Sequence, residues 1–256
     1  MERRFSGLAR LYGLEGAQRI QDAHVAIIGI GGVGSWAAES LARSGVGRLT
    51  LVDMDHLAES NINRQIHAVE ATIGQAKVLA MRDRIHSFYP ECDVTCIEEF
   101  VESSNWPQLL PEGVIAVIDA CDQVKAKTVM AAWAQSTRTH FISVGAAGGK
   151  RHAHLVDIDD LAKVTHDPLL TQVRHRLRKE HAAAREGKRM GVACVFSGES
   201  VKVPDLSCSK ENDGTLNCHG YGSVVCVTST FGQCAAGWIL DEISQEAESC
   251  KKSVII

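Results

Sequence analysis

The first 145 residues alternate short runs of aliphatic and β-branched residues with longer segments in which apolar residues recur every three or four positions. This alternation is typical of stacked β-α-β units, in which helices connect parallel strands. The predicted strands span 24–29, 49–53, 94–99, 114–119 and 140–145, and the predicted helices span about 33–44, 75–88 and 124–136. The pattern therefore predicts an α/β fold with a mainly parallel sheet.

The pattern changes after residue 150. Polar and aliphatic residues mix at 152–159, a charged segment with helical spacing spans 168–186, and an aliphatic run follows at 192–196. A polar loop rich in Cys, Asn, Gly and Ser comes next. Residues 221–240 carry no charge, but their Thr, Ser, Gln and Gly residues favour a buried helix over a membrane span.

The composition is typical of one folded domain. Of the 256 residues, 45% are hydrophobic and 23% are charged, which excludes a disordered, collagen-like or coiled-coil chain. No repeat or low-complexity linker divides the sequence. We therefore expect a single domain over 1–256, with a core at 1–149 and a C-terminal extension, 150–256, packed on the same sheet.

Charge, the N-terminal segment and the cysteines add weaker indications. The net charge of −4 predicts neither a nucleic-acid nor a membrane partner by itself. The N-terminal segment has basic residues but no apolar run of about 7–15 residues behind them, so we expect no secretory signal and a cytoplasmic location. The nine cysteines lack the spacing of a disulfide framework, and we expect free thiols.

A glycine-rich motif follows the first predicted strand. Gly29, Gly31 and Gly34 form GxGxxG, in which glycines allow the backbone to approach a phosphate whose charge the helix N-terminus attracts. Asp53 ends the second strand about 20 residues later, where a carboxylate accepts hydrogen bonds from a ribose. The core is therefore predicted to be a Rossmann-like, doubly wound sheet that binds a nucleotide. An NAD-dependent dehydrogenase fits these residues equally well, and a turn without a ligand is the alternative.

The residues after the second strand separate these interpretations. Asn61, Arg64, Gln65 and Lys77 would gather at one phosphate-binding mouth. A dinucleotide enzyme does not need the two cations, whereas cleavage of a triphosphate at its α-phosphate does, because charge develops on the phosphoryl oxygens. Solvated surface charges are the alternative for Arg64 and Lys77.

Two carboxylates follow the fourth predicted strand. Asp119 ends the strand and Asp122 lies just beyond it, and such a carboxylate can hold Mg²⁺ against phosphates. Asp119 could instead cap the next helix, so Asp122 is the preferred metal ligand.

The segments GIGGVGSW, LVDMDHLAESNINRQ, IGQAK and DACD resemble the adenylating domain of ubiquitin-activating enzymes and of bacterial enzymes that activate sulfur carriers. The resemblance covers roughly residues 5–145. It implies that a carboxylate attacks the α-phosphate of ATP, giving an acyl-adenylate and pyrophosphate. The implied ATP-binding residues are Gly29, Gly31, Gly32, Gly34, Asp53, Asp55, Asn61, Arg64, Gln65 and Lys77.

The resemblance also implies catalytic roles and a homodimer. Arg64, Lys77 and Asp122 are the implied catalytic residues of one subunit, with Asp122 on Mg²⁺. In that family an N-terminal arginine reaches the γ-phosphate from the other subunit, and Arg10 is the candidate here.

The cysteine pattern and the second part of the chain narrow the choice within this family. No CxxC pair is present, Cys92 and Cys96 are spaced by three residues, and Cys208 and Cys218 have no paired neighbours, so we do not expect the structural zinc of the sulfur-carrier enzymes. A chain of 256 residues leaves no room for the extra domains of ubiquitin-activating enzymes.

The segments DIDDLAKVTHDPLLTQVRHRLRK, GVACVFSGE and CHGYGSVVCVTSTFG resemble the bacterial tRNA threonylcarbamoyladenosine dehydratases, a subfamily of these enzymes. The resemblance implies adenylation of the threonylcarbamoyl carboxylate on adenosine 37 of tRNA and ring closure with loss of water. Ring closure within one nucleoside requires no transfer cysteine, and we interpret Cys194 as a core residue rather than a nucleophile. Activation of a small sulfur-carrier protein is the alternative. An ATP-dependent switch, a sulfur-relay accessory partner and a monovalent cation in the Gly-rich C-terminal loops also stay open.

A basic segment supports an RNA substrate for the 150–256 part. Residues 171–189 hold seven Lys or Arg against two Glu, so the segment carries +5 and the rest of the chain −9. A positive patch on an acidic body is typical of an RNA contact, and a solvated helix face is the alternative. His166 and Asp167 are candidates for placing the substrate. The predicted RNA-binding residues are Arg174, Arg176, Arg178, Lys179, Arg185, Lys188 and Arg189.

Overall fold

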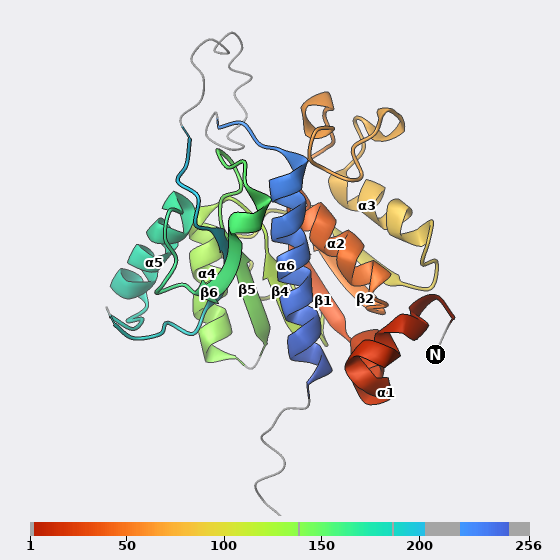
Figure 1. Ribbon diagram of the computed structural model, residues 1–256, viewed down its shortest axis with the longest axis horizontal. Helices are drawn as coiled ribbons and strands as arrows, with labels where there is room; N and C mark the ends of the chain where they lie inside the picture. The colour runs from red at the N-terminus through yellow and green to blue at the C-terminus, as the bar shows by residue number, and fades with distance from the viewer. Residues whose placement is uncertain (1–2, 138, 186, 203–220, 246–256) are drawn as a thin grey trace, which may run out of the picture.

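A seven-stranded sheet forms the centre of the computed structural model, which describes residues 3–137, 139–185, 187–202 and 221–245 (Figure 1). The strand order is β3-β2-β1-β4-β5-β7-β6, and every neighbouring pair is parallel except β6 with β7. The strands are β1 His24–Ile28, β2 Arg48–Val52, β3 Asp93–Ile97, β4 Ala116–Asp119, β5 His140–Val144, β6 Val156–Asp160 and β7 Ala193–Ser197. The order reverses direction between β1 and β4, which confirms the predicted doubly wound fold.

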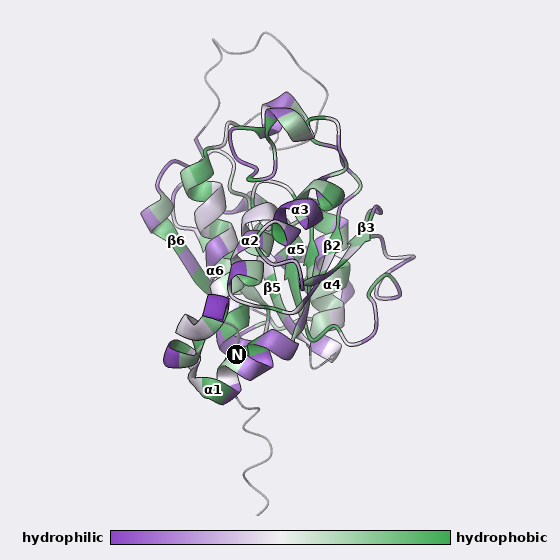
Figure 2. Cartoon of the chain, turned by 90° about the vertical axis from the view of Figure 1, so that its right-hand side faces the viewer, coloured by the Kyte–Doolittle hydropathy of each residue, from purple (hydrophilic) through white to green (hydrophobic). Residues whose placement is uncertain are grey.

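Helices cover both faces of the sheet. The α-helices are α1 Ser6–Asp22, α2 Gly34–Arg43, α3 Lys77–His86, α4 Val124–Ser136, α5 Pro168–Glu180 and α6 Val225–Ser244. Four 3₁₀ helices are η1 Arg3–Phe5, η2 Glu59–Asn61, η3 Glu70–Thr72 and η4 Ala153–Leu155. On one face α6 packs against α1, α2 and β5, and on the other α4 packs against α5. Figure 2 shows the apolar strands between these layers.

Each central strand contributes side chains to both hydrophobic cores, because successive side chains point to opposite faces of a sheet. In β1, Val25 and Ile27 belong to the core under α2 and α6, whereas Ala26 and Ile28 belong to the core under α4 and α5. All four side chains are buried. Burial on both faces explains why β1 reads as an uninterrupted hydrophobic run rather than as an alternating one.

The predicted elements agree with the observed ones apart from their ends, but two features differ. The predicted helix at 168–186 ends at Glu180, because His181 leaves the helix and Ala182 adopts a positive φ of 51°. Helix α1 was not anticipated, since its glycines weaken the helical pattern, and the helix is kinked at Gly13. Among the described residues, no helix is long and apolar enough to cross a membrane. The uncharged segment instead forms most of α6.

Helix α6 approaches α2 at a glycine. A Cβ added to Gly232 would meet the carbonyl oxygen of Val33 and would lie 2.9 Å from the backbone nitrogen of Ala37. Gly237, one and a half turns later, has no atom within 4 Å of an added Cβ. The two glycines therefore separate the effect of crowding from the effect of helix propensity.

We expect Gly232→Ala to lower the free energy of unfolding by roughly 1–3 kcal/mol, the usual cost of overpacking. Gly237→Ala is the matched control, and it should raise stability by about 0.5–1 kcal/mol because alanine is the better helix former. Urea unfolding of both variants measures the difference. Equal midpoints would contradict the proposed contact between α2 and α6.

Candidate active site

The glycine-rich turn between β1 and α2 lies at the carboxyl edge of the sheet, where the strand order reverses. Gly29 has a φ of +88°, and a Cβ there would lie 2.9 Å from the carbonyl of Ala120. A Cβ on Gly34 would overlap the carbonyl oxygen of Gly29. By contrast, a Cβ on Gly31 would meet nothing within 4 Å. Gly29 and Gly34 are thus required by the fold, whereas Gly31 faces open space.

Asp53, at the end of β2, holds this turn in place. Its Oδ2 accepts a hydrogen bond from the Ile30 N–H at 2.6 Å, and its Oδ1 accepts one from the Asp55 N–H at 2.9 Å. Burial is the main influence and raises the pKa of Asp53, although the Lys77 ammonium and the two N–H groups oppose the rise. The predicted ribose-binding carboxylate is therefore fixed by the backbone on both sides.

Lys77 begins α3 and is only 3% exposed. Its Nζ lies 2.6 Å from Oδ2 of Asp55 and 4.0 Å from Oδ1 of Asp53. The predicted phosphate cation is thus paired with carboxylates in the structure, and a triphosphate would have to compete with Asp55 for it. The Asp55 side chain is 43% exposed, so it can turn toward solvent.

The loop between β2 and α3 places Arg64 over the glycine-rich turn. A Cβ on Gly32 would lie 3.1 Å from Cγ of Arg64, and Nε1 of Trp36 donates to the Arg64 carbonyl at 2.9 Å. The guanidinium donates to the Ser60 carbonyl at 2.7 Å and to Oδ1 of Asn63 at 2.9 Å. Arg64 is therefore beside the predicted phosphate position but must exchange these contacts to bind an anion.

The two remaining predicted ATP contacts in this loop, Asn61 and Gln65, are both buried. Oδ1 of Asn61 accepts a hydrogen bond from the Ala58 N–H at 3.1 Å, which stabilises η2. Oε1 of Gln65 is buried and has no hydrogen-bond partner. Oε1 of Gln65 is thus free to accept a hydrogen bond from a ligand, whereas Oδ1 of Asn61 already bonds to the loop backbone.

The structure separates the two carboxylates that follow β4. Asp119 is fully buried, accepts hydrogen bonds from Ser143 and Cys121, and pairs with Lys127. It does not cap α4, whose N-cap residue is Gln123. Asp122 is exposed, and its carboxylate has no hydrogen bond or ion pair within the described part of the chain. Its oxygens suit Mg²⁺, whereas those of Asp119 are occupied.

Arg10 lies at the other end of the sheet. It is an exposed residue of α1, which leads into the amino end of β1 (Figure 1). The preceding Phe5 packs against Tyr89 and Gly45, which come before β3 and β2. Arg10 is therefore at the amino edge, on the opposite side from the glycine-rich turn of the same chain.

The predicted basic surface divides into two parts. Arg174 donates to the carbonyls of Leu161 and Val164 at 3.0 and 2.8 Å, and Arg178 donates to that of Ala184 at 3.2 Å. Both guanidiniums thus hold the chain around α5. Arg176 lies 3.8 Å from the carboxylate of Glu180. The exposed cations of the segment are Lys179, Arg185, Lys188 and Arg189.

Of the two residues before α5, Asp167 has a structural role and His166 is exposed. Asp167 is buried and caps α5, accepting hydrogen bonds from the N–H groups of Leu170 and Ala146. These hydrogen bonds give Asp167 a structural role that requires no substrate. His166 is exposed and has a positive φ of 55°, which is strained for a residue with a side chain.

The cysteine considered as a nucleophile, Cys194, lies in the core. Cys194 is fully buried, and burial raises its pKa well above the ordinary value, in accord with a core residue. Within the described residues, no three His, Cys, Asp or Glu side chains are grouped as metal ligands. Cys208 and Cys218, and most of the Gly-rich C-terminal loop, lie outside the described residues.

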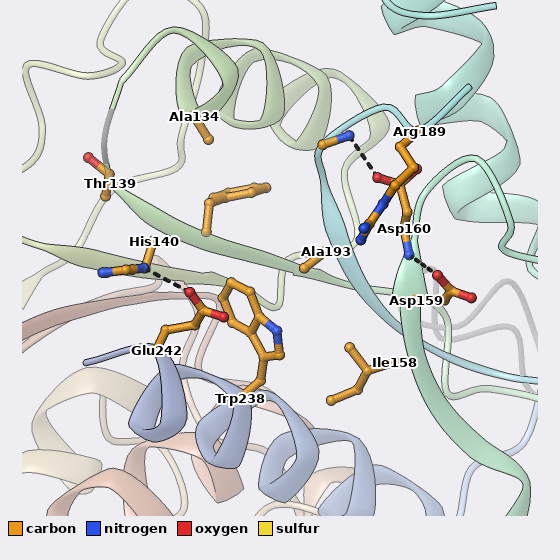
Figure 3. Close-up of a pocket in the computed structure, with 12 residues that line it drawn as sticks. Ala134, Thr139, His140, Ile158, Asp159, Asp160, Arg189, Ala193, Trp238 and Glu242 are labelled. Atoms are coloured by element: carbon orange, nitrogen blue, oxygen red, sulfur yellow. Dashed lines mark hydrogen bonds and ion pairs between the residues drawn. The ribbon is translucent and has the colours of Figure 1, made fainter. Parts of the chain in front are cut away.

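Sequence reasoning missed the buried charge of Lys127 and a cavity. Lys127 is fully buried in α4, and the signal for it was a lysine on the apolar face that also carries Met130 and Ala131. A cavity of about 410 Å³ lies at the amino edge, lined by Trp238 and by His140 and Glu242, whose side chains approach to 3.4 Å (Figure 3). No pattern marked this cavity, because its lining comes from segments far apart in the sequence.

Comparison with known proteins identifies the family. The model of the ThiF family matches residues 4–255, and the chain belongs to that family.

Individual relatives show what this chain resembles within the family. The chain is 40% identical to a tRNA threonylcarbamoyladenosine dehydratase of Haemophilus influenzae, over 94% of each chain. It is 39% identical to that of Escherichia coli, over 95% of this chain and 94% of the relative. A crystal structure of E. coli tRNA N6-threonylcarbamoyladenosine dehydratase in complex with ATP matches with a TM-score of 0.85 and 40% identity, covering 94% of this chain and 93% of that one.

The two glycines of the turn should respond differently to alanine. We expect Gly34→Ala to lower the free energy of unfolding by roughly 1–3 kcal/mol, because its Cβ overlaps the Gly29 carbonyl. Gly31→Ala should leave stability unchanged but weaken nucleotide binding by about tenfold or more, because its Cβ occupies the space a phosphate would enter. Thermal unfolding and calorimetric titration with ATP measure both effects. Wild-type ATP affinity in Gly31→Ala would place the phosphates elsewhere.

Proposed function

We propose that this chain catalyses the ATP-dependent dehydration of N6-threonylcarbamoyladenosine at position 37 of tRNA. One observation carries the proposal: the similarity to dehydratases of this modification extends over 94% of the chain. It therefore includes the part after residue 150, beyond the nucleotide-binding core. The similarity of a core alone would support only an adenylating enzyme of unspecified substrate.

The chemistry proceeds in two balanced steps. An oxygen of the threonyl carboxylate attacks the α-phosphorus of ATP, and the bond to the β-phosphate oxygen breaks to release pyrophosphate. A urea nitrogen or oxygen of the same nucleoside then attacks the activated carbonyl, loses its proton, and expels AMP. The ring closes at high effective concentration because both groups belong to one substrate. The nucleoside has lost one water, whose oxygen leaves in AMP.

The site residues are proposed to act on ATP as follows. The glycine-rich turn, with Gly32, receives the phosphates, and Asp53 receives the ribose. Arg64 and Lys77 neutralise phosphate charge, and Lys77 exchanges its Asp55 partner for a phosphate oxygen. When Mg²⁺ is bound, it neutralises phosphate charge, and Asp122 is the residue to hold it, because its exposed carboxylate is free within the described chain.

The chain is proposed to work as a homodimer in the cytoplasm, the compartment of its tRNA substrate. The position of Arg10 at the amino edge supports the dimer, since Arg10 is remote from the glycine-rich turn of its own chain. In the dimer Arg10 completes the phosphate site of the other subunit. The chemistry itself requires neither a sulfur-relay accessory protein nor a transfer thiol.

Mixed dimers test the shared site. Arg10→Ala and Asp122→Ala should each be inactive alone, and mixing them should restore activity at about a quarter of the sites, because half of the dimers then contain one intact site. Mixing Arg64→Ala with Asp122→Ala is the control, since both residues belong to the same subunit's site. If the two mixtures behave alike, Arg10 does not cross between subunits.

The exposed cations are proposed to contact the tRNA backbone. Helix α5 runs from Asp167, beside the end of β5, toward the amino edge, where the N–H of Met190 donates to Asp160. The exposed cations therefore lie at the C-terminal end of α5 and in the segment after it, toward the amino edge. An RNA whose modified base enters the site can reach them by extending its adjoining stem along α5.

The salt dependence of tRNA affinity measures these contacts. Replacing Lys179, Arg185 and Lys188 with Ala should flatten the log–log slope by about two to three units, since each phosphate contact contributes roughly 0.7–0.9. Arg82→Ala, on α3 at the opposite face of the sheet, is the control and should leave the slope unchanged. ATP affinity should not change in either variant. An unchanged slope in the triple variant would indicate a merely solvated surface.

The product identifies the reaction. Incubation with ATP and tRNA that carries the modification should give AMP, pyrophosphate and a nucleoside lighter by one water, measured by mass spectrometry of digested tRNA. ADP and phosphate, or an unchanged nucleoside, would contradict the proposed function. Consumption of ATP with a small sulfur-carrier protein, but not with tRNA, would favour the alternative substrate.

A further inference from the structure

A lysine without any solvent contact lies beneath the candidate active site. Lys127, in the first turn of α4, is fully buried. Its Nζ is 3.0 Å from Oδ1 of Asp119, which is also fully buried. The ammonium donates to the carbonyls of Asp119 and Val144 at 3.2 and 2.7 Å, and to Oγ of Ser143 at 3.3 Å.

Both carboxylate oxygens of Asp119 also have hydrogen-bond donors. Its Oδ2 accepts a hydrogen bond from the Ser143 hydroxyl at 2.6 Å, and its Oδ1 accepts bonds from the Cys121 N–H at 3.3 Å and the Cys121 thiol at 3.1 Å. Burial is the largest influence and acts to lower the pKa of Lys127, but Asp119 together with Cys121 and Cys194 outweighs it, so that the pKa is raised. The result is a charged pair that ties the carboxyl ends of β4 and β5 together.

Stability alone is a weak explanation for this pair. The free energy lost when two charges leave water offsets much of the free energy gained from their attraction. Apolar side chains of similar size often stabilise a core equally well. Buried ionic networks do, however, fix the geometry of the groups that they contact. The backbone that this network contacts lies in the candidate site.

The contacts lead from Lys127 to the glycine-rich turn and to Asp122. Ala120, which follows Asp119, donates its N–H to the carbonyl of Ile28 at 2.8 Å. The peptide between Ala120 and Cys121 lies so close to Gly29 that a Cβ there would approach it to 2.9 Å. Asp122 comes one residue later and has no partner of its own in the described structure. Its position therefore depends on the fixed peptide before it.

We propose that Lys127 is a positioning residue: through Asp119 and the Cys121 N–H, it holds residues 120–122 so that the Asp122 carboxylate faces the phosphates. The inference rests on the proposed function, because it assumes that the site takes ATP with Mg²⁺. Loss of the buried pair should thus impair the effect of Mg²⁺ more than the binding of the adenosine part, which the glycine-rich turn and Asp53 hold.

The test compares nucleotide binding with and without Mg²⁺ in the full chain. The variant Asp119→Asn with Lys127→Met removes both charges and leaves neither one unpaired. Its affinity for α,β-methylene ATP in EDTA should equal that of the wild type, whereas the Mg²⁺ concentration needed for half-maximal tightening should rise about tenfold or more. The control, Glu39→Gln with Arg84→Met, removes an ion pair of 2.9 Å between α2 and α3 and should keep the wild-type Mg²⁺ midpoint.

A milder variant covers the case in which the double variant does not fold. Ser143→Ala removes one hydrogen bond from Asp119 without changing charge, and it should raise the Mg²⁺ midpoint by several-fold. Wild-type midpoints in Ser143→Ala or in a folded double variant would overturn the positioning role but leave the proposed function intact. If the affinity of the wild type itself were independent of Mg²⁺, both the inference and the proposed ATP chemistry would be contradicted.

Discussion

The backbone of the glycine-rich turn packs directly against the peptide that follows β4, and the geometry of the site depends on this contact. Side chains at Gly29 or Gly34 would collide with backbone atoms, so the approach is possible only without a Cβ. Asp53 adds a hydrogen bond to Ile30 from the end of β2. Three strand ends thereby meet beside Gly31, where an added Cβ would find no atom within 4 Å. An anion in this space would lie at the N-terminus of α2, which favours negative charge.

The charges around this space are balanced by partners that a nucleotide can replace. Lys77 pairs with the half-exposed Asp55, and Arg64 donates to a loop carbonyl and an asparagine side chain. Lys77 is itself buried, but its partner Asp55 is half-exposed and can be replaced by a phosphate oxygen. Lys127 and Asp119 show the opposite case, because both are fully buried and each neutralises the other. The exposure of the partner therefore distinguishes the cation that can bind a ligand from the one that holds the backbone.

The sequence was sufficient for a doubly wound, mainly parallel sheet, because buried parallel strands and amphipathic helices leave strong local patterns. It also identified the family through motifs whose glycines and polar residues stand at fixed spacings. Local patterns were insufficient where tertiary contacts decide the outcome. Asp119 and Asp122 are alike in sequence, yet only the fold pairs Asp119 with Lys127. Likewise, Arg174 and Arg178 belong to a basic run, but the path of the chain around α5 gives their guanidiniums carbonyl partners.

In the proposed reaction, the substrate carboxylate itself attacks the α-phosphorus of ATP. This step can be followed by labelling both oxygens of the threonylcarbamoyl carboxylate with ¹⁸O and analysing all products by mass spectrometry. We expect AMP with one ¹⁸O atom, while the carbonyl of the closed ring keeps the other. Unlabelled AMP, or label in inorganic phosphate, would contradict the proposed adenylation.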